Sequence, residues 1–136
     1  MKSKYFRIEE LVPKELYDVL GEKMCWKLFD DRLIEMLDKI KEKFPDGSMT
    51  VNNWVWGGDR NWSGLRLPGK PYYSPTSQHS LGKAIDAVFS AYTAEEVRHG
   101  IMANIEEFPY IKGIEDDVSW LHVDVRDRQE LLVFKA

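Results

Sequence analysis

The residues best suited to chemistry lie in the middle of the chain, where a histidine and an aspartate stand on either side of a glycine. His79 and Asp86 are seven residues apart, and Gly82 lies between them. Asp86 sits within the apolar run Ala84-Ile85-Asp86-Ala87-Val88-Phe89. An isolated carboxylate is costly to bury, so an aspartate in such a run needs a partner. A metal ion is one candidate for that partner.

A second histidine lies near the C-terminus, in a segment whose polar and apolar residues alternate. The segment Trp120-Leu121-His122-Val123-Asp124-Val125-Arg126 has the period of a half-buried strand. This alternation places His122, Asp124 and Arg126 on one face of the strand. Two histidines and one aspartate, one from this segment and two from the first block, could therefore converge.

This set of side chains is suited to zinc. Neutral imidazole nitrogens and a carboxylate oxygen are ordinary zinc ligands, and three protein ligands leave a fourth position for water. An open position is expected where the ion is catalytic and not structural. The same ligand types also accept other divalent ions. We therefore predict a Zn²⁺ site formed by His79, Asp86 and His122.

The two blocks together resemble the M15 zinc peptidases, which include D-alanyl-D-alanine carboxypeptidases and phage endolysins. The resemblance rests on the pattern Ser77-x-His79-x-x-Gly82-x-Ala84-x-Asp86 and on the later His122-x-Asp124 strand. It covers the chain from about Asn52 to Arg126. The same metal-binding fold occurs in the Hedgehog signalling domain. The resemblance implies a zinc metallopeptidase that hydrolyses peptidoglycan stem peptides, as a D,D-carboxypeptidase or as an L-alanyl-D-glutamate endopeptidase.

The resemblance also implies substrate-binding residues in the segment before the first block. Members of the family carry an arginine there that holds the carboxylate or carbonyl oxygen of the substrate. Arg66 in Ser63-Gly64-Leu65-Arg66 best fits that place, and Arg60 is the second choice. Ser77, which opens the first block, is a further candidate for substrate binding. The alternative is that both arginines stack on neighbouring tryptophans and only order the loop.

The identity of the general base is open. Peptide hydrolysis needs such a base, usually a carboxylate within hydrogen-bond reach of the attacking water. Many members of the family place an acid three residues before the second histidine, but Ser119 occupies that position here. Asp124 could be the base, because strand alternation puts it on the face of His122. Its alternative role is to accept a hydrogen bond from a ligand imidazole and fix the tautomer.

Two alternatives to Asp124 as the base are open. A carboxylate from the turn Glu115-Asp116-Asp117 could reach the site. The chain could also bind metal without hydrolysing anything, as a non-catalytic metal-binding module or a virion structural module with the same fold. From the resemblance we expect a working hydrolase in which Asp124 and Arg66 are catalytic.

Composition limits the other classes of function. Residues 1–136 are expected to form a single domain with its own core. Hydrophobic residues make up 43% of the chain and charged residues 31%, which is typical of a globular protein. The formal net charge of -4 provides no overall basic field, so we expect no nucleic-acid partner.

The N-terminal segment bears on where the protein acts. The charged segment Met1–Arg7 is followed by Glu9 and Glu10 and lacks the apolar core of a signal peptide. No apolar stretch approaches the ~20 residues of a membrane span. We therefore expect synthesis in the cytoplasm and no membrane span. The peptidoglycan substrate would be reached after release by another factor, as for a phage lysin, or from a virion.

Several helices and strands must bring the blocks together, and periodicity predicts them. Helices are expected from Pro13 to Gly21, over residues 28–44, and from the N-cap Thr93 to Pro109. Strands are expected near residues 49–55, 84–89, 111–116, 120–125 and 131–134. The predicted class is α+β, with N-terminal helices on one side of a mainly antiparallel sheet, in a Hedgehog-like or D,D-peptidase-like arrangement.

Overall fold

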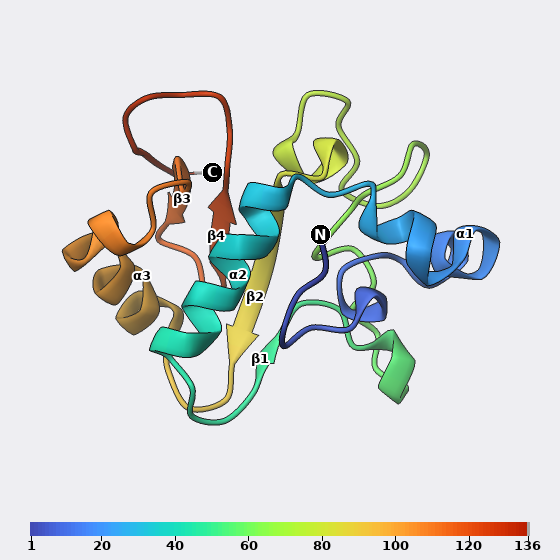
Figure 1. The fold of residues 1–136 in the computed structure, drawn as a ribbon, viewed down its shortest axis with the longest axis horizontal. Coiled ribbons are helices and arrows are strands. Elements are labelled where there is room, and N and C mark those ends of the chain that lie inside the picture. The colour runs from blue at the N-terminus through green and yellow to red at the C-terminus, as the bar shows by residue number, and fades with distance from the viewer. Residues whose placement is uncertain (136) are drawn as a thin grey trace.

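The fold combines three α-helices with a five-stranded sheet in the computed structural model of the protein, which describes residues 1–135 (Figure 1). The helices are α1 (Lys14–Trp26), α2 (Asp31–Lys43) and α3 (Ala94–Ala103). The strands are β1 (Met49–Thr50), β2 (Ala84–Phe89), β3 (Gly113–Asp116), β4 (Leu121–Asp124) and β5 (Leu132–Lys135). The predicted α+β class is confirmed.

The sheet is mixed, and its strand order is β1-β2-β4-β3-β5. β1 pairs with β2, β2 with β4, and β4 with β3, all antiparallel, whereas β3 and β5 are parallel. The register places Asp86 opposite His122 and His122 opposite Glu115. Directly paired residues share a face of the sheet, so these three side chains point to the same side.

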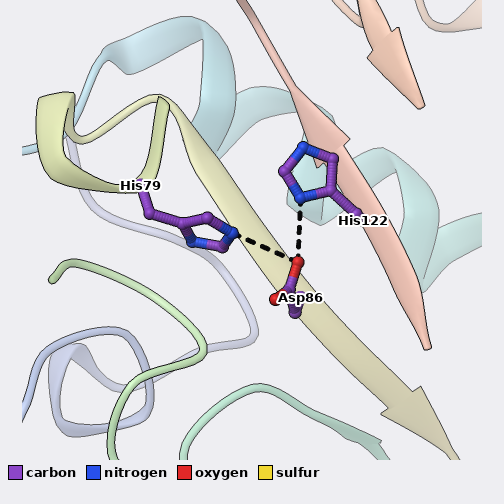
Figure 2. A group of neighbouring side chains, drawn as sticks. All are labelled: His79, Asp86 and His122. Atoms are coloured by element: carbon purple, nitrogen blue, oxygen red, sulfur yellow. Dashed lines mark hydrogen bonds and ion pairs between the residues drawn. The ribbon is translucent and has the colours of Figure 1, made fainter. Parts of the chain in front are cut away.

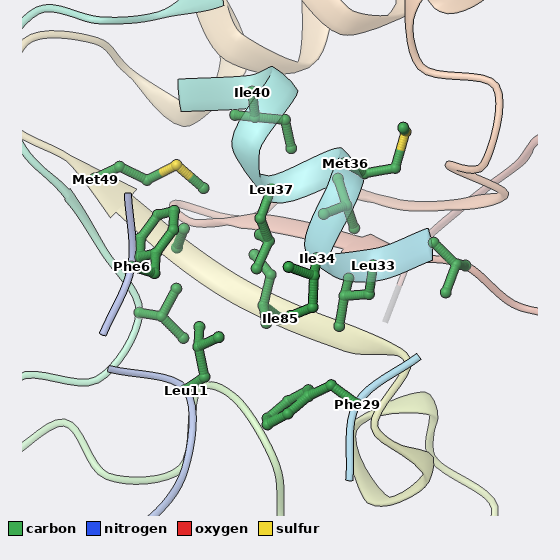
Figure 3. Packing of buried hydrophobic residues seen from close by; sticks show 14 of the residues in the cluster. Phe6, Leu11, Phe29, Leu33, Ile34, Met36, Leu37, Ile40, Met49 and Ile85 are labelled. Carbon is green, nitrogen blue, oxygen red and sulfur yellow. The ribbon is translucent and has the colours of Figure 1, made fainter. Parts of the chain in front are cut away.

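The opposite face of the sheet is apolar and holds the core. Ile85, Val123 and Ile114 are paired across β2, β4 and β3, and all are fully buried. Figures 1 and 3 show α2 crossing this side of the sheet, with Leu37 and Ile34 directed at Ile85. Side-chain alternation with a period of two therefore gives the central strands one apolar face under α2 and one polar face on the other side.

α1 matches its prediction at Gly21 but differs from it in packing. Gly21 has a non-helical backbone, with φ 75° and ψ 177°, so the first helical segment ends there as predicted and a second segment continues to Trp26. Of its residues only Cys25 and Trp26 are buried, and Val19 is 79% exposed. Figure 1 shows α1 beside the sheet and not on it. The expectation that the N-terminal helices cover the sheet is therefore met by α2 and wrong for α1.

Two other predicted elements are shorter than expected. The strand expected over residues 49–55 contains only β1, and Trp54–Trp56 forms a 3-10 turn. Side chains account for this, because Asn52 and Trp54 both donate to the carbonyl of Val12 and draw the chain out of the sheet. α3 begins with the predicted Thr93 capping box but ends at Ala103, and a separate 3-10 turn follows. Within residues 1–135, no helix has the length and apolar character needed to cross a bilayer.

Gly82 allows a close approach between the first block and the segment that leads into α2. Its φ is +69°, and a Cβ there would lie 2.1 Å from the carbonyl oxygen of Leu28. The carbonyl of Gly82 accepts a hydrogen bond from the amide of Asp30, which is the N-cap of α2. Glycine is therefore required at this position for two separate reasons, conformation and space.

We predict that Gly82→Ala destabilises the protein more than Gly69→Ala. Gly69 has a similar φ of +76°, but a Cβ there would meet nothing within 4 Å. Gly69→Ala should therefore lower the free energy of unfolding only by the cost of the left-handed conformation, about 1–2 kcal/mol. Overpacking against Leu28 should add at least about 1 kcal/mol at Gly82. Urea unfolding of both variants measures the difference, and equal free energies of unfolding would contradict the close approach.

Candidate metal centre

His79 is held by a short capped turn. Ser77 is the N-cap of the 3-10 turn Gln78–Leu81, and its hydroxyl accepts a hydrogen bond of 3.2 Å from the amide of His79. The ring Nδ1 lies 3.0 Å from the carbonyl oxygen of Gly64. A carbonyl only accepts, so Nδ1 carries the proton and Nε2 is left to face Asp86. Ser77, predicted to bind substrate, therefore has a structural role in positioning His79.

Asp86 and His122 are brought together by the register of β2 and β4. The Oδ1 atom of Asp86 lies 2.9 Å from Nδ1 of His122 and 3.2 Å from Nε2 of His79. Figure 2 shows both rings directed at this one carboxylate. One ligand atom from each of the three residues lies within 4.8 Å of the others. The structure thus brings together the three side chains that the sequence predicted as metal ligands.

The Asp86 carboxylate is almost buried and is surrounded by polar and cationic side chains. Burial alone would raise its pKa, but the hydrogen bond from His122 and the interaction with His79 outweigh burial and hold the pKa well below its usual range. Its second oxygen, Oδ2, accepts a hydrogen bond of 3.1 Å from Nη2 of Arg66. Asp86 is therefore ionised at neutral pH, which is the state that binds a metal ion.

Asp124 lies on the far side of the His122 ring. Its carboxylate is fully buried, accepts a 2.8 Å hydrogen bond from Nε2 of His122, and is paired with the Arg126 guanidinium at 2.6 and 2.7 Å. Burial raises its pKa, but the bonds from Arg126 and His122 lower it to about 2. The ring of His122 thus separates Asp124 from Asp86. This position suits the orientation of a ligand imidazole better than contact with an attacking water.

A glycine on the neighbouring strand makes room for this buried carboxylate. Gly113 pairs with Asp124 across β3 and β4, and a Cβ at Gly113 would lie 2.2 Å from Oδ1 of Asp124. Gly64 allows a similar approach, because a Cβ there would lie 2.0 Å from the carbonyl oxygen of Leu11. Sequence reasoning missed both glycines. Each glycine is required by a residue far away in the chain, which a local pattern does not reveal.

The three residues fit a zinc ion in type and in approximate geometry. Bonds of 2.0–2.2 Å in a tetrahedral site place ligand atoms roughly 3.3–3.6 Å apart. Oδ1 of Asp86 lies 2.9 Å from the nearer nitrogen of His122 and 3.2 Å from that of His79, and all three ligand atoms lie within 4.8 Å of one another. These separations bracket the tetrahedral range, so small rotations of the side chains would allow them to bind one ion. Each ligand also has an outer partner that fixes its orientation, namely the Gly64 carbonyl, Arg66 and Asp124. The group could therefore hold a metal ion.

An open cleft of about 770 Å³ gives access to these residues. Aromatic side chains form part of its wall, and Glu115, Ser119 and Arg126 also line it. Glu115 is 9% exposed. It lies on β3 opposite His122 of β4, so the two side chains share one face of the sheet. Of the three acids in the predicted turn, only Glu115 lines this cleft. A carboxylate, that of Glu115, is thus present near the candidate metal ligands, although Ser119 occupies the position where the resembled family usually has an acid.

The two predicted substrate arginines differ in what they contact. Arg66 binds Asp86 and also donates from Nε to the carbonyl of Trp62 at 2.8 Å. Arg60 donates to the carbonyl of Val51 and to the hydroxyl of Ser63, both at 2.9 Å. Both arginines line the cleft. Arg60 is thus held by the backbone of Val51 and by Ser63, whereas Arg66 lies beside the metal ligands.

Comparison with known proteins assigns no relative to the chain. The chain matches no protein-family model, no curated protein and no solved structure. The functional proposal for this site therefore rests on the chemistry of its own side chains and on the sequence pattern that contains them.

We predict that His79→Ala, Asp86→Ala and His122→Ala each abolish stoichiometric zinc binding, because two ligands rarely hold the ion tightly. His99→Ala is the matched control, since His99 is exposed on α3 and is not among the three grouped residues. Elemental analysis after dialysis measures the zinc content. Full retention of zinc by His79→Ala would show that the ligand assignment is wrong.

We also predict that zinc binding releases a proton from His122. Burial lowers the pKa of His122, but bonds to Asp124 and Asp86 outweigh burial and raise it to about 9. The metal-free ring is therefore protonated at pH 7, whereas a ligand imidazole must be neutral. Affinity should rise about tenfold per pH unit from pH ~6.5 to ~9 and then level off.

Calorimetric titration of zinc at pH 7 in two buffers of different ionisation enthalpy counts the released protons. About one proton is expected from His122. The same titration of Asp124→Asn should release fewer, because the variant loses a carboxylate that raises the pKa of the ring. An unchanged proton count in Asp124→Asn would contradict this account of His122.

Proposed function

We propose that the chain is a zinc-dependent peptidase that hydrolyses peptidoglycan stem peptides. The observation that carries the proposal is the convergence of His79, Asp86 and His122, from two distant blocks of sequence, in an open cleft. Three protein ligands leave one coordination position for water or substrate, which is the arrangement of catalytic zinc sites. A structural zinc site would supply a fourth protein ligand and would not need a cleft.

The proposed residues divide the work of hydrolysis between them. When bound, zinc would supply a Lewis acid that polarises the peptide carbonyl and lowers the pKa of water. Asp124 holds His122 in one orientation through Nε2, and the Gly64 carbonyl does the same for His79 through Nδ1. Arg66 orients Asp86 through its second carboxylate oxygen, and its cationic group is close enough to the ligands to attract a substrate carbonyl or carboxylate.

Glu115 is the general base in this proposal. The register of β3 and β4 puts its side chain on the same face of the sheet as His122, and the residue lines the cleft. Asp124, favoured by sequence, has both oxygens occupied by Arg126 and His122. Glu115 accepts a proton from the attacking water and can return it to the amine that leaves. Ser119 lines the same cleft but cannot act as a base.

The substrate assignment rests on the resemblance of the Ser77 to Asp86 block and the His122-x-Asp124 strand to the M15 peptidases. A Hedgehog-like arrangement of the sheet and a role as a phage lysin belong to the same proposal. D,D-carboxypeptidase and L-alanyl-D-glutamate endopeptidase activity are both carried forward. The competing function is a metal-binding or virion module without turnover, which the position of Ser119 motivates.

Incubation of the zinc-loaded protein with purified peptidoglycan tests the activity. Mass spectrometry of the soluble products should show either free D-alanine or peptides with new D-glutamate amino termini. The inactive control is His122→Ala. Bound zinc without release from any wall type would reject the peptidase and leave the metal-binding module.

We predict that Glu115→Gln and Asp124→Asn fail in different ways. Glu115→Gln should keep zinc and lose about 10²–10⁴-fold in turnover, because an amide cannot take the proton. Asp124→Asn should weaken zinc binding by about 10–100-fold, and added zinc should restore much of the activity. Glu106→Gln, an exposed acid beyond α3, is the control. Zinc content and hydrolysis rate are measured for all three, and the reverse pattern would make Asp124 the base.

A further inference from the structure

A second cleft adjoins the metal cleft at the far end of β2. It has a volume of about 470 Å³ and shares two lining residues, Val88 and Ser119, with the metal cleft. Phe89, Tyr92 and Val118 form its apolar wall, and the first turn of α3 closes one side. The two clefts therefore meet at the end of β2, at Val88 and Ser119.

The spacing along β2 relates the second cleft to the proposed site of hydrolysis. Asp86 and Val88 are two residues apart on the same strand and point to the same face. Two residues of a strand span about 6.6 Å, and an extended substrate advances by about the same distance over two residues. A substrate residue roughly two positions from the cleaved bond would therefore lie in the second cleft.

The second cleft contains a buried arginine with unused donors. Arg98 is 5% exposed and lines the cleft. Among residues 1–135, its guanidinium makes one hydrogen bond, from Nη1 to the carbonyl of Trp120 at 3.0 Å, and its Nε lies 3.7 Å from Asp116. A guanidinium has five N–H donors in a planar fork that matches a carboxylate. Most of these donors are thus available to a ligand in the cleft.

Two acids line the same cleft nearer to solvent. Glu95 belongs to the first turn of α3, and Asp117 follows β3 with a φ of 61°. Both are exposed, in contrast to Arg98. A ligand with only a carboxylate would meet these negative charges, and one with only an ammonium would leave the remaining donors of Arg98 without an acceptor. A group with an ammonium and a carboxylate on one carbon satisfies all three residues.

We propose that the second cleft is a substrate subsite for the zwitterionic end of a diamino-dicarboxylic acid side chain, of the diaminopimelate type. The carboxylate pairs with Arg98, the ammonium lies toward Glu95 and Asp117, and the methylene chain packs on Val88 and Phe89. The subsite would select among wall peptides by the residue at the third position of the stem peptide. In that respect this inference rests on the proposed peptidase function. The binding itself requires neither zinc nor turnover.

Three capped probes separate the charges of the ligand. They are the Nα-acetyl amides of diaminopimelate, lysine and α-aminopimelate. Lysine lacks the distal carboxylate, and α-aminopimelate lacks the distal ammonium, while the chain length is the same. Titration of ¹⁵N-labelled protein followed by NMR gives both the affinity and the site. The diaminopimelate probe should bind about tenfold or more tightly than the lysine probe and shift the amides of α3.

Variants link the binding to the named residues. Glu95→Gln and Asp117→Asn change exposed side chains, so they should fold, and each should weaken the diaminopimelate probe by about two- to fivefold. Neither change should weaken binding of the α-aminopimelate probe, because that probe has no ammonium. Arg98→Lys should remove most of the preference over lysine. Glu106→Gln is the unaffected control.

The test also separates this subsite from the proposed enzymatic activity. The protein freed of zinc by a chelator should bind the diaminopimelate probe as tightly as the zinc-loaded protein. If wall hydrolysis fails but the probe binds as described, the subsite stands and the peptidase function falls. Equal binding of the three probes, binding of none, or shifts confined to other surfaces would overturn the subsite, whether or not the protein hydrolyses peptidoglycan.

Discussion

The buried carboxylate of Asp86 is the constraint on which the site depends. An ionised group at this depth is stable only with cationic or hydrogen-bonding partners on both oxygens. Here the partners come from three segments, because His79 lies in the capped 3-10 turn Gln78–Leu81, His122 lies on β4, and Arg66 belongs to the loop between Trp56 and Gln78. Removing any one partner without a metal ion in place would leave charge uncompensated. The same geometry that satisfies the carboxylate forms a site for a divalent cation.

The sheet separates stability from chemistry by the alternation of its side chains. Ile85, Val123 and Ile114 bury one face under α2, and the residues next to them in sequence, Asp86, His122 and Glu115, face the cleft. A shift of register by one residue would exchange the two sets, which the buried core forbids. Packing under α2 therefore fixes the strand register that brings Asp86 and His122 within hydrogen-bond distance of each other. α2 does not need to contact the cleft for this.

The sequence predicted the site better than it predicted the segments around it. His79, Asp86 and His122 were found because each lies in a local pattern, a glycine-containing block or an alternating strand. Gly64 and Gly113 were missed because their need arises from Leu11 and Asp124, which are distant in the chain. The nearness of Glu115 to His122 also required the pairing of β3 with β4, since alternation fixes a face but not the neighbours on it.

A crystal structure of the zinc-loaded protein, with anomalous data at the zinc edge, would show whether these three residues hold the ion. We expect one zinc ion bonded at about 2.0–2.2 Å to Nε2 of His79, to a carboxylate oxygen of Asp86 and to Nδ1 of His122. Nε2 of His122 should still donate to Asp124. An ion bound through other atoms, or no anomalous peak between these side chains at saturating zinc, would contradict this ligand assignment.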